Sequence, residues 1–158
     1  MPFSIDNQEM MRQIIVDNYQ NPRNYQEVTD PRYITIHMDS ASCIDDIYVH
    51  VLIEGGLIKD CKWHGKGCAI STASTSIMTE LVLGKTMEEA TSIMNEFNKM
   101  LDGKDFDEDV LDEAICFINV NRQPSRITCA NISWRGLQKA FIEEEKKEHE
   151  WRRKRITR

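Results

Sequence analysis

A change in hydrophobic periodicity along the chain is the feature that most constrains its fold. Residues 33–64 alternate polar and apolar side chains, most clearly over residues 47–53. A period of two is typical of strands with one buried face. From residue 69 onward the apolar residues recur at helical spacing instead. Strands followed by helices predict an α+β domain, with helices packed on one face of a small three-stranded antiparallel sheet.

The boundaries of the elements follow from caps and turns. A first helix is predicted over residues 4–20, with Ser4 as its cap and Asn21-Pro22 as its stop. The three predicted strands are 33–38, 47–53 and 57–64, and Gly55-Gly56 forms the turn between the last two. Later helices are predicted to begin near residue 69, at the capping box Thr86-Met87-Glu88-Glu89, near residue 111 and after the cap Ser125. Residues 102–113 form an acidic connector, and the last helix is expected to fray beyond Glu145.

Composition indicates one globular domain in a reducing compartment. The chain has 158 residues, of which 41% are hydrophobic and 29% charged. We expect a single domain over 1–145 and a basic tail over 146–158. No apolar run approaches the ~20 residues that span a bilayer, and the first residues do not resemble a secretory signal. We therefore expect a cytoplasmic protein without a membrane partner.

The charge distribution argues against a nucleic-acid partner. The net charge is −6, although residues 151–158 carry five basic side chains and no acid. The rest of the chain is therefore strongly acidic. General binding to nucleic acid requires clustered Lys and Arg that contact phosphates. Nucleic acid is accordingly an unlikely partner for the body of the protein.

Three of the five cysteines stand at turns or helix starts together with one aspartate. Cys43 and Asp45 share a turn between predicted strands, Cys68 follows a Gly-Lys-Gly turn, and Cys129 begins the last helix. Reduced thiols in a cytosolic protein favour metal binding or catalysis. Three thiolates and a carboxylate fit a four-ligand zinc site. The same thiols could instead hold an iron–sulfur cluster or carry sulfur as a persulfide.

The surroundings of these cysteines favour thiolates. A helix start stabilises negative charge at Cys68 and Cys129 through free N–H groups. Arg126 lies three residues before Cys129, so the two share a helix face, and its charge would offset a shell of negative ligands. Cys61 and Cys116 lie in apolar patterns and are expected to be buried small hydrophobes. His64 precedes the Gly-Lys-Gly turn and could approach the site, whereas His37 and His50 are expected at the surface.

Four sequence blocks carry a family resemblance. They are N-P-R-N at 21–24, C-x-D at 43–45, G-x-G-C-x-I-S-x-A-S-x-S at 65–76 and R-I-x-C-x-x-x-S-W at 126–134. With these blocks the chain resembles the IscU/NifU-N superfamily of iron–sulfur cluster assembly proteins, over roughly residues 5–145. Thr128 stands where IscU-type scaffolds have histidine, and the acidic connector lengthens the interval before Cys129. Both features are similar to the SufU branch.

The resemblance implies a function and a set of site residues. It places zinc on Cys43, Asp45, Cys68 and Cys129, and assigns Cys43 as the acceptor of persulfide sulfur. The implied partners are a pyridoxal-phosphate cysteine desulfurase similar to SufS, and a downstream iron–sulfur scaffold or apo-protein. The alternatives are a scaffold that holds a transient iron–sulfur cluster and a structural zinc adaptor without turnover. The chain departs from the family pattern with Ser40-Ala41-Ser42 before Cys43 and with Ile44 in place of glycine.

Overall fold

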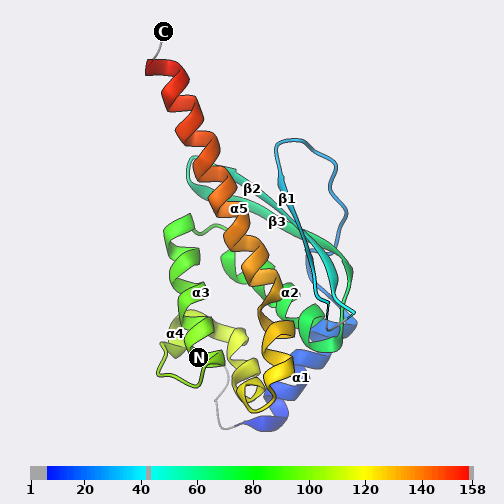
Figure 1. Cartoon of the computed structure of the whole chain (residues 1–158). Helices are drawn as coiled ribbons and strands as arrows, with labels where there is room; N and C mark the ends of the chain where they lie inside the picture. Colours follow the sequence, from blue (N-terminus) through cyan, green and yellow to red (C-terminus); the bar gives the residue numbers. More distant parts are fainter. Residues whose placement is uncertain (1–6, 42–43, 157–158) are drawn as a thin grey trace.

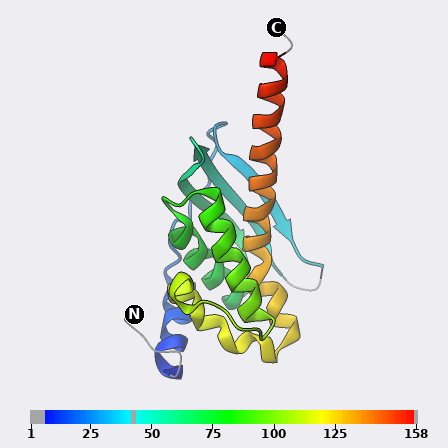
Figure 2. The ribbon, with the colours of Figure 1, turned by 90° about the vertical axis from the view of Figure 1, so that its left-hand side faces the viewer.

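The fold is a three-stranded antiparallel sheet covered by helices on one face, as Figures 1 and 2 show. The computed structural model describes residues 7–41 and 44–156. Its elements are α1 (Gln8–Gln20), β1 (Ile34–Asp39), β2 (Asp46–Glu54), β3 (Leu57–Lys66), α2 (Ala69–Val82), α3 (Met87–Leu101), α4 (Glu108–Leu111), the 3₁₀ segment η1 (Asp112–Arg122) and α5 (Pro124–Ile156). The predicted α+β class and the three-stranded sheet are confirmed.

The sheet is a meander in the order β1-β2-β3. Ile36 lies opposite Val49, which in turn lies opposite Trp63, so these side chains share a face. The predicted turn between β2 and β3 is present, and Gly55 and Gly56 both adopt positive φ, at 60° and 77°. Residues other than glycine rarely adopt positive φ at both positions of a two-residue turn. The alternation read from residues 47–53 therefore becomes the buried face of the central strand.

Helices α2 and α5 lie directly against the sheet. Helix α5 contacts β1 and β2, whereas α2 contacts β3 and also packs against α1 and α5. The approach of α5 is close, because a Cβ atom on Gly136 would lie 2.9 Å from Met38 Cγ of β1. A second layer is built by α3 and η1, where Phe97 stacks on Trp134 of α5 with ring centroids 4.2 Å apart. This packing fixes where the starts of α2 and α5 lie relative to the sheet.

Three predicted helix boundaries differ in the structure. Helix α1 begins at Gln8, where the Asn7 side chain accepts a hydrogen bond from the Met10 N–H, and Ser4 lies outside the described residues. Helix α5 begins at Pro124 rather than after a Ser125 cap, in agreement with the preference of proline for the first helical position. The segment predicted as a short helix near residue 111 is the longer 3₁₀ segment η1.

The expectation that the last helix frays beyond Glu145 is wrong. Helix α5 continues to Ile156 and projects beyond the sheet in both ribbon views. Oppositely charged pairs at a spacing of four, such as Glu148 with Arg152 and Glu150 with Lys154, favour a solvated helix. Within the described ranges, no helix is both long and apolar enough to cross a membrane.

Candidate metal centre

The structure brings together three of the four predicted ligands. Asp45 ends the turn between β1 and β2, Cys68 precedes the first residue of α2, and Cys129 lies in the second turn of α5. One potential ligand atom from each residue lies within 4.8 Å of the other two. Asp45 and Cys129 are buried, with 2% and 4% of their surface exposed, and Cys68 is half-buried. The cluster therefore joins the sheet to the starts of two helices.

One oxygen of the Asp45 carboxylate is fixed and the other has no partner. Oδ1 accepts hydrogen bonds from the Cys68 N–H at 3.1 Å and from the Ser71 hydroxyl at 2.6 Å. Oδ2 is buried and receives no hydrogen bond from the described residues. An unpartnered buried carboxylate oxygen is costly unless a cation or donor satisfies it. Beside two thiols, this oxygen offers a donor set that suits zinc, which accepts both sulfur and oxygen ligands.

Cys68 occupies the N-cap position of α2 with extended backbone angles. Its sulfur accepts a hydrogen bond from the Ser71 N–H at 3.4 Å, one of the free amide groups at the helix start. Burial raises the pKa of the Cys68 thiol, but hydrogen bonds with the Ser71 N–H, the Ser71 hydroxyl and Cys129 outweigh burial and leave that pKa below its ordinary value. The predicted bias of this cysteine toward the thiolate is consistent with this geometry.

The two glycines before Cys68 are required for different reasons. Gly65 has φ of 123° and passes so close to β2 that a Cβ atom would lie 2.1 Å from the Asp46 carbonyl oxygen. Gly67 lacks a positive φ, but a Cβ atom there would lie 2.3 Å from Ser71 Oγ and 3.1 Å from Asp45 Oδ1. Gly67 thus leaves the space in which Ser71 and Asp45 meet.

Cys129 lies two residues further into its helix than predicted, in the second turn rather than the first, because α5 begins at Pro124. Its thiol donates to the Ser125 carbonyl oxygen at 3.7 Å. The helix-terminus effect falls off within the first turn, so it favours a thiolate at Cys129 less than the sequence predicted. Arg126 shares the helix face at a spacing of three but is exposed, and its guanidinium makes no hydrogen bond or ion pair within the described part of the chain.

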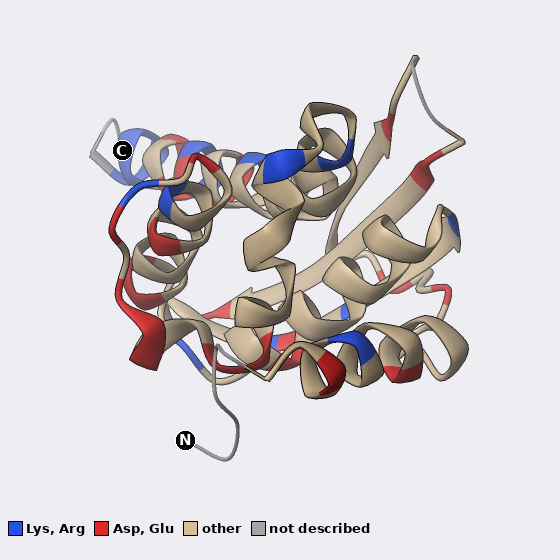
Figure 3. Ribbon diagram, turned by 90° about the horizontal axis from the view of Figure 1, so that it is seen from below, with Lys and Arg blue, Asp and Glu red and all other residues tan. Residues whose placement is uncertain are grey.

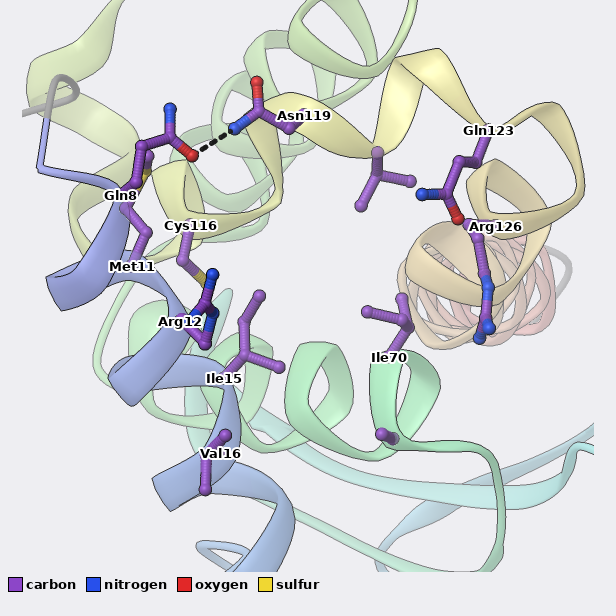
Figure 4. Close-up of a pocket in the computed structure, with 12 residues that line it drawn as sticks. Gln8, Met11, Arg12, Ile15, Val16, Ile70, Cys116, Asn119, Gln123 and Arg126 are labelled. Atoms are coloured by element: carbon purple, nitrogen blue, oxygen red, sulfur yellow. Dashed lines mark hydrogen bonds between the residues drawn. The ribbon is translucent and has the colours of Figure 1, made fainter.

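A groove of about 530 Å³ begins beside the cluster and runs between α1, η1 and the starts of α2 and α5. Figure 4 shows Arg126 and Gln123 on one side of the groove and Arg12, Ile15 and Val16 of α1 on the other. Ala69 and Ile70, which follow Cys68, form part of the wall. Arg126 therefore faces an open groove next to the cluster.

The remaining cysteines divide as the sequence predicts, except for one that cannot be placed. Cys61 and Cys116 are buried in the core, and burial raises the pKa of Cys61 to about 12 and that of Cys116 well above its ordinary value. Both are therefore buried small hydrophobes, as predicted. Cys43, the predicted fourth ligand and sulfur acceptor, lies outside the described residues.

Sequence reasoning missed the contribution of Ser71 and misplaced His50. The serines of α2 were expected to serve helix packing, and Ser74 and Ser76 do so through bonds to the Ala130 carbonyl and to Asn18. Ser71 additionally donates a hydrogen bond to Asp45. The position of Ser71 three residues after Cys68 was the sequence feature that could have indicated a role at the site. His50 is buried rather than at the surface, with Nε2 bonded to His64 Nδ1 at 2.8 Å.

Comparison with known proteins places this chain in a family. The NifU-like N terminal domain family matches residues 10–149. The zinc-dependent sulfurtransferase SufU of Bacillus subtilis is 36% identical over 92% of this chain and 98% of its own length. The iron–sulfur cluster assembly scaffold protein IscU of Thermotoga maritima is 32% identical over 84% of this chain and 94% of its own length.

Solved structures agree with these relationships. A putative iron–sulfur cluster assembly scaffold protein for the SUF system from Fervidobacterium islandicum superimposes with a TM-score of 0.76 at 34% identity, covering 82% of this chain and 96% of that one. A NifU-like N-terminal domain from Brucella abortus shares the fold, with a TM-score of 0.80 at 19% identity over 91% of this chain and 99% of that one. The fold, the Asp-Cys-Cys cluster and these matches together show that the chain belongs to the NifU-like N-terminal domain family of iron–sulfur cluster assembly proteins.

Proposed function

We propose that this protein is a zinc-dependent sulfurtransferase that accepts persulfide sulfur from a cysteine desulfurase for iron–sulfur cluster assembly. The observation that carries the proposal is the buried Asp45 carboxylate, which keeps one oxygen without a partner beside the thiols of Cys68 and Cys129. The identity to the zinc-dependent sulfurtransferase SufU over nearly the whole chain supports the same assignment.

The residues assigned to zinc are Cys43, Asp45, Cys68 and Cys129. Zinc has no redox chemistry of its own, and when bound it favours the thiolate form of its cysteine ligands. Ser71 and the Cys68 N–H orient the Asp45 carboxylate, and Gly67 keeps the space between them open. Arg126 contributes a positive charge beside a strongly negative ligand set.

Sulfur transfer requires one accessible thiolate, which we assign to Cys43. Its thiolate attacks the outer sulfur of the desulfurase persulfide, so that a new S–S bond forms on Cys43 and the desulfurase cysteine leaves as a thiolate. The exchange has no net oxidation or reduction, and the proton on the outer sulfur stays with it. Cys68 caps α2 and Cys129 lies within α5, so release of either sulfur would disturb a helix start. We therefore assign the acceptor role to Cys43.

The partners follow from this chemistry. A pyridoxal-phosphate cysteine desulfurase of the SufS type supplies the persulfide, and an iron–sulfur scaffold or an apo-protein receives the sulfur. We place the reaction in the cytoplasm, where thiols remain reduced. The chain would then act as a sulfurtransferase, because it returns to its starting state after each delivery.

The second candidate is a scaffold for a transient iron–sulfur cluster, which the 32% identity to an IscU scaffold favours. Thiolates and a carboxylate can also hold iron. Thr128, at the position where IscU-type scaffolds have histidine, argues for transfer instead. Metal and acid-labile sulfide analysis of protein purified without oxygen separates the two candidates. We expect about one zinc per chain and no sulfide, whereas stoichiometric iron with sulfide would replace transfer by scaffolding.

A second measurement tests turnover. Added to its cognate desulfurase, the protein should increase the rate of cysteine consumption, because it discharges the enzyme persulfide. A protein that binds zinc but leaves this rate unchanged would be a structural zinc adaptor rather than a sulfurtransferase.

A further inference from the structure

The C-terminal half of α5 extends away from the rest of the molecule. The helix has 33 residues and is therefore about 50 Å long. Its side chains are exposed over residues 145–155, and both ribbon views show this end projecting past the sheet. A polar helix without tertiary contacts requires either its own side-chain pairs or a partner.

The projecting segment has acidic and basic halves. Residues 143–150 contain five acidic residues and two lysines, and residues 152–155 are all basic. Figure 3 shows Lys and Arg gathered at the C-terminal end of α5, with acidic residues preceding them. If a second copy of the helix ran antiparallel to the first, the acidic half of each would lie beside the basic half of the other.

One face of the helix matches its own reversed copy residue by residue. Ile142, Glu145, His149 and Arg153 follow one another at spacings of three and four, so they form a narrow stripe, and position 156 continues it. The same face is hollowed into a shallow groove, whose lining includes these four residues together with Lys146 and Glu150. The stripe is symmetric about His149, because Glu145 and Arg153 are each four residues from it and positions 142 and 156 are each seven.

We propose that a second copy of this chain docks antiparallel along this stripe, with the two-fold axis at His149. Glu145 of each copy then lies opposite Arg153 of the other. A guanidinium has five N–H donors, so Arg153 can contact a neighbour in its own helix and a carboxylate of the second copy together. A two-fold interface of this kind uses the same patch on both copies.

Charge selects the antiparallel arrangement over the parallel one. Parallel copies would place Glu145 beside Glu145 and Arg153 beside Arg153, and such like-charge pairs repel. The antiparallel pairs are exposed, and exposed pairs contribute at most about 1 kcal/mol each and are screened by salt. Two short helices also bury less than the ~1,200 Å² of a standard stable interface. The dimer should therefore be weak, concentration-dependent and sensitive to salt.

The docking surface is separate from the candidate metal centre. Cys129 precedes Ile142 by 13 positions along the same helix, or about 20 Å. Dimerisation therefore leaves the cluster and its groove accessible. Stimulation of the desulfurase should be the same for variants that dimerise and variants that do not, so a failure of the proposed function and a failure of this proposal can be distinguished.

Sedimentation velocity of the full chain over a range of protein concentrations tests the proposal. The native chain should shift from monomer to dimer as concentration rises at low salt, and should remain monomeric in about 1 M salt, where the Debye length is about 3 Å. Glu145→Arg and Arg153→Glu should each keep the chain monomeric at low salt. Glu143→Lys, which also turns an acid into a base but about 100° around the helix from Ile142, should leave dimerisation unchanged.

The double variant Glu145→Arg/Arg153→Glu provides the decisive comparison. It restores opposite charges across the two-fold axis and should recover the dimer that each single change abolishes. Circular dichroism of every variant shows whether the helix itself persists. A native chain that stays monomeric at every concentration would overturn the proposal. A dimer that survives Glu145→Arg, or one that the double variant does not restore, would overturn the assigned stripe and register.

Discussion

The hydroxyl of Ser71 donates a 2.6 Å hydrogen bond to Asp45 Oδ1, although the two residues are separated by 26 positions in the chain. Together with the bond from the Cys68 N–H, it orients a buried carboxylate whose other oxygen, Oδ2, has no partner among the described residues. Residues that orient a metal ligand do not contact the metal, but their removal typically lowers metal affinity. Ser71 is therefore expected to tune the candidate metal centre.

Ser71→Ala should weaken zinc binding by about 10- to 100-fold, because Asp45 loses the shorter of the two hydrogen bonds that orient it. Competition with a chromophoric chelator measures this affinity. Ser76→Ala is the matched control, since Ser76 lies on the same helix and is equally buried but bonds to Asn18. It should lower the free energy of unfolding by about 1 kcal/mol and leave zinc affinity unchanged. Equal zinc affinities in the two variants would contradict the orienting role of Ser71.

Asp45→Asn should release zinc more readily and abolish most of the stabilisation that zinc provides. The amide keeps an oxygen that can accept from the Cys68 N–H, but it lacks the negative charge that a metal ligand supplies. Native protein should melt at a lower temperature after chelation, because metal bound to the folded state adds folding free energy. In Asp45→Asn that difference should shrink. The neighbouring exposed Asp46, changed in the same way, should behave like the native chain.

Gly67→Ala should damage the site more than the fold. Gly67 has no positive φ, so alanine is compatible with its backbone, but the added methyl would lie 2.3 Å from Ser71 Oγ. Displacement of Ser71 should free the Asp45 carboxylate and lower zinc affinity at least tenfold. Calorimetric titration of the metal-free variant measures the loss. Native affinity in Gly67→Ala would mean that Ser71 and Asp45 can separate without consequence.

Cys43→Ser should abolish stimulation of the desulfurase, because serine cannot accept the sulfur. Cys61→Ser and Cys116→Ser should retain stimulation in the fraction that folds, since both side chains are buried in the core. Alkylation followed by mass spectrometry should locate the persulfide on Cys43. Sulfur on Cys129, together with stimulation by Cys43→Ser, would show that another cysteine is the acceptor.

The buried His50 should make the metal-free protein less stable at acidic pH. The loss should begin as the pH falls below about 6.5, the ordinary pKa of histidine. Burial, and then the neighbouring His64, lower the pKa of His50, while Glu27 acts in the opposite direction. The folded state thus disfavours the protonated ring, so stability is complete above the unfolded-state pKa and declines as the pH drops through it. Thr35 and His64 occupy the two ring nitrogens, and the bond between the imidazoles needs one unprotonated nitrogen. Denaturant unfolding at several pH values, with exposed His37→Gln as control, should show a weaker acid dependence only in His50→Gln.

Local sequence signals predicted the elements better than their ends. The alternation over residues 47–53 and the Thr86 capping box appear in the structure as expected, because each depends on neighbours within a few residues. The start of α5 was predicted after Ser125 but lies at Pro124. Both residue types are common at a helix N-terminus, so local sequence could not decide between them. The continuation of α5 to Ile156 was missed because a charged segment without an apolar face carries no signal of burial.

The sequence by itself determined the sheet, the order of the helices and the residue types available for a metal. Only the tertiary structure decided that Asp45, Cys68 and Cys129 meet within 4.8 Å. It also decided that His50 is buried, although His50 and Val49 are on opposite faces of β2. Periodicity and capping arise from interactions between near neighbours, so they can be read along the chain. Which distant side chains oppose each other depends on how helices α2 and α5 pack on the sheet, and no local pattern specifies that packing.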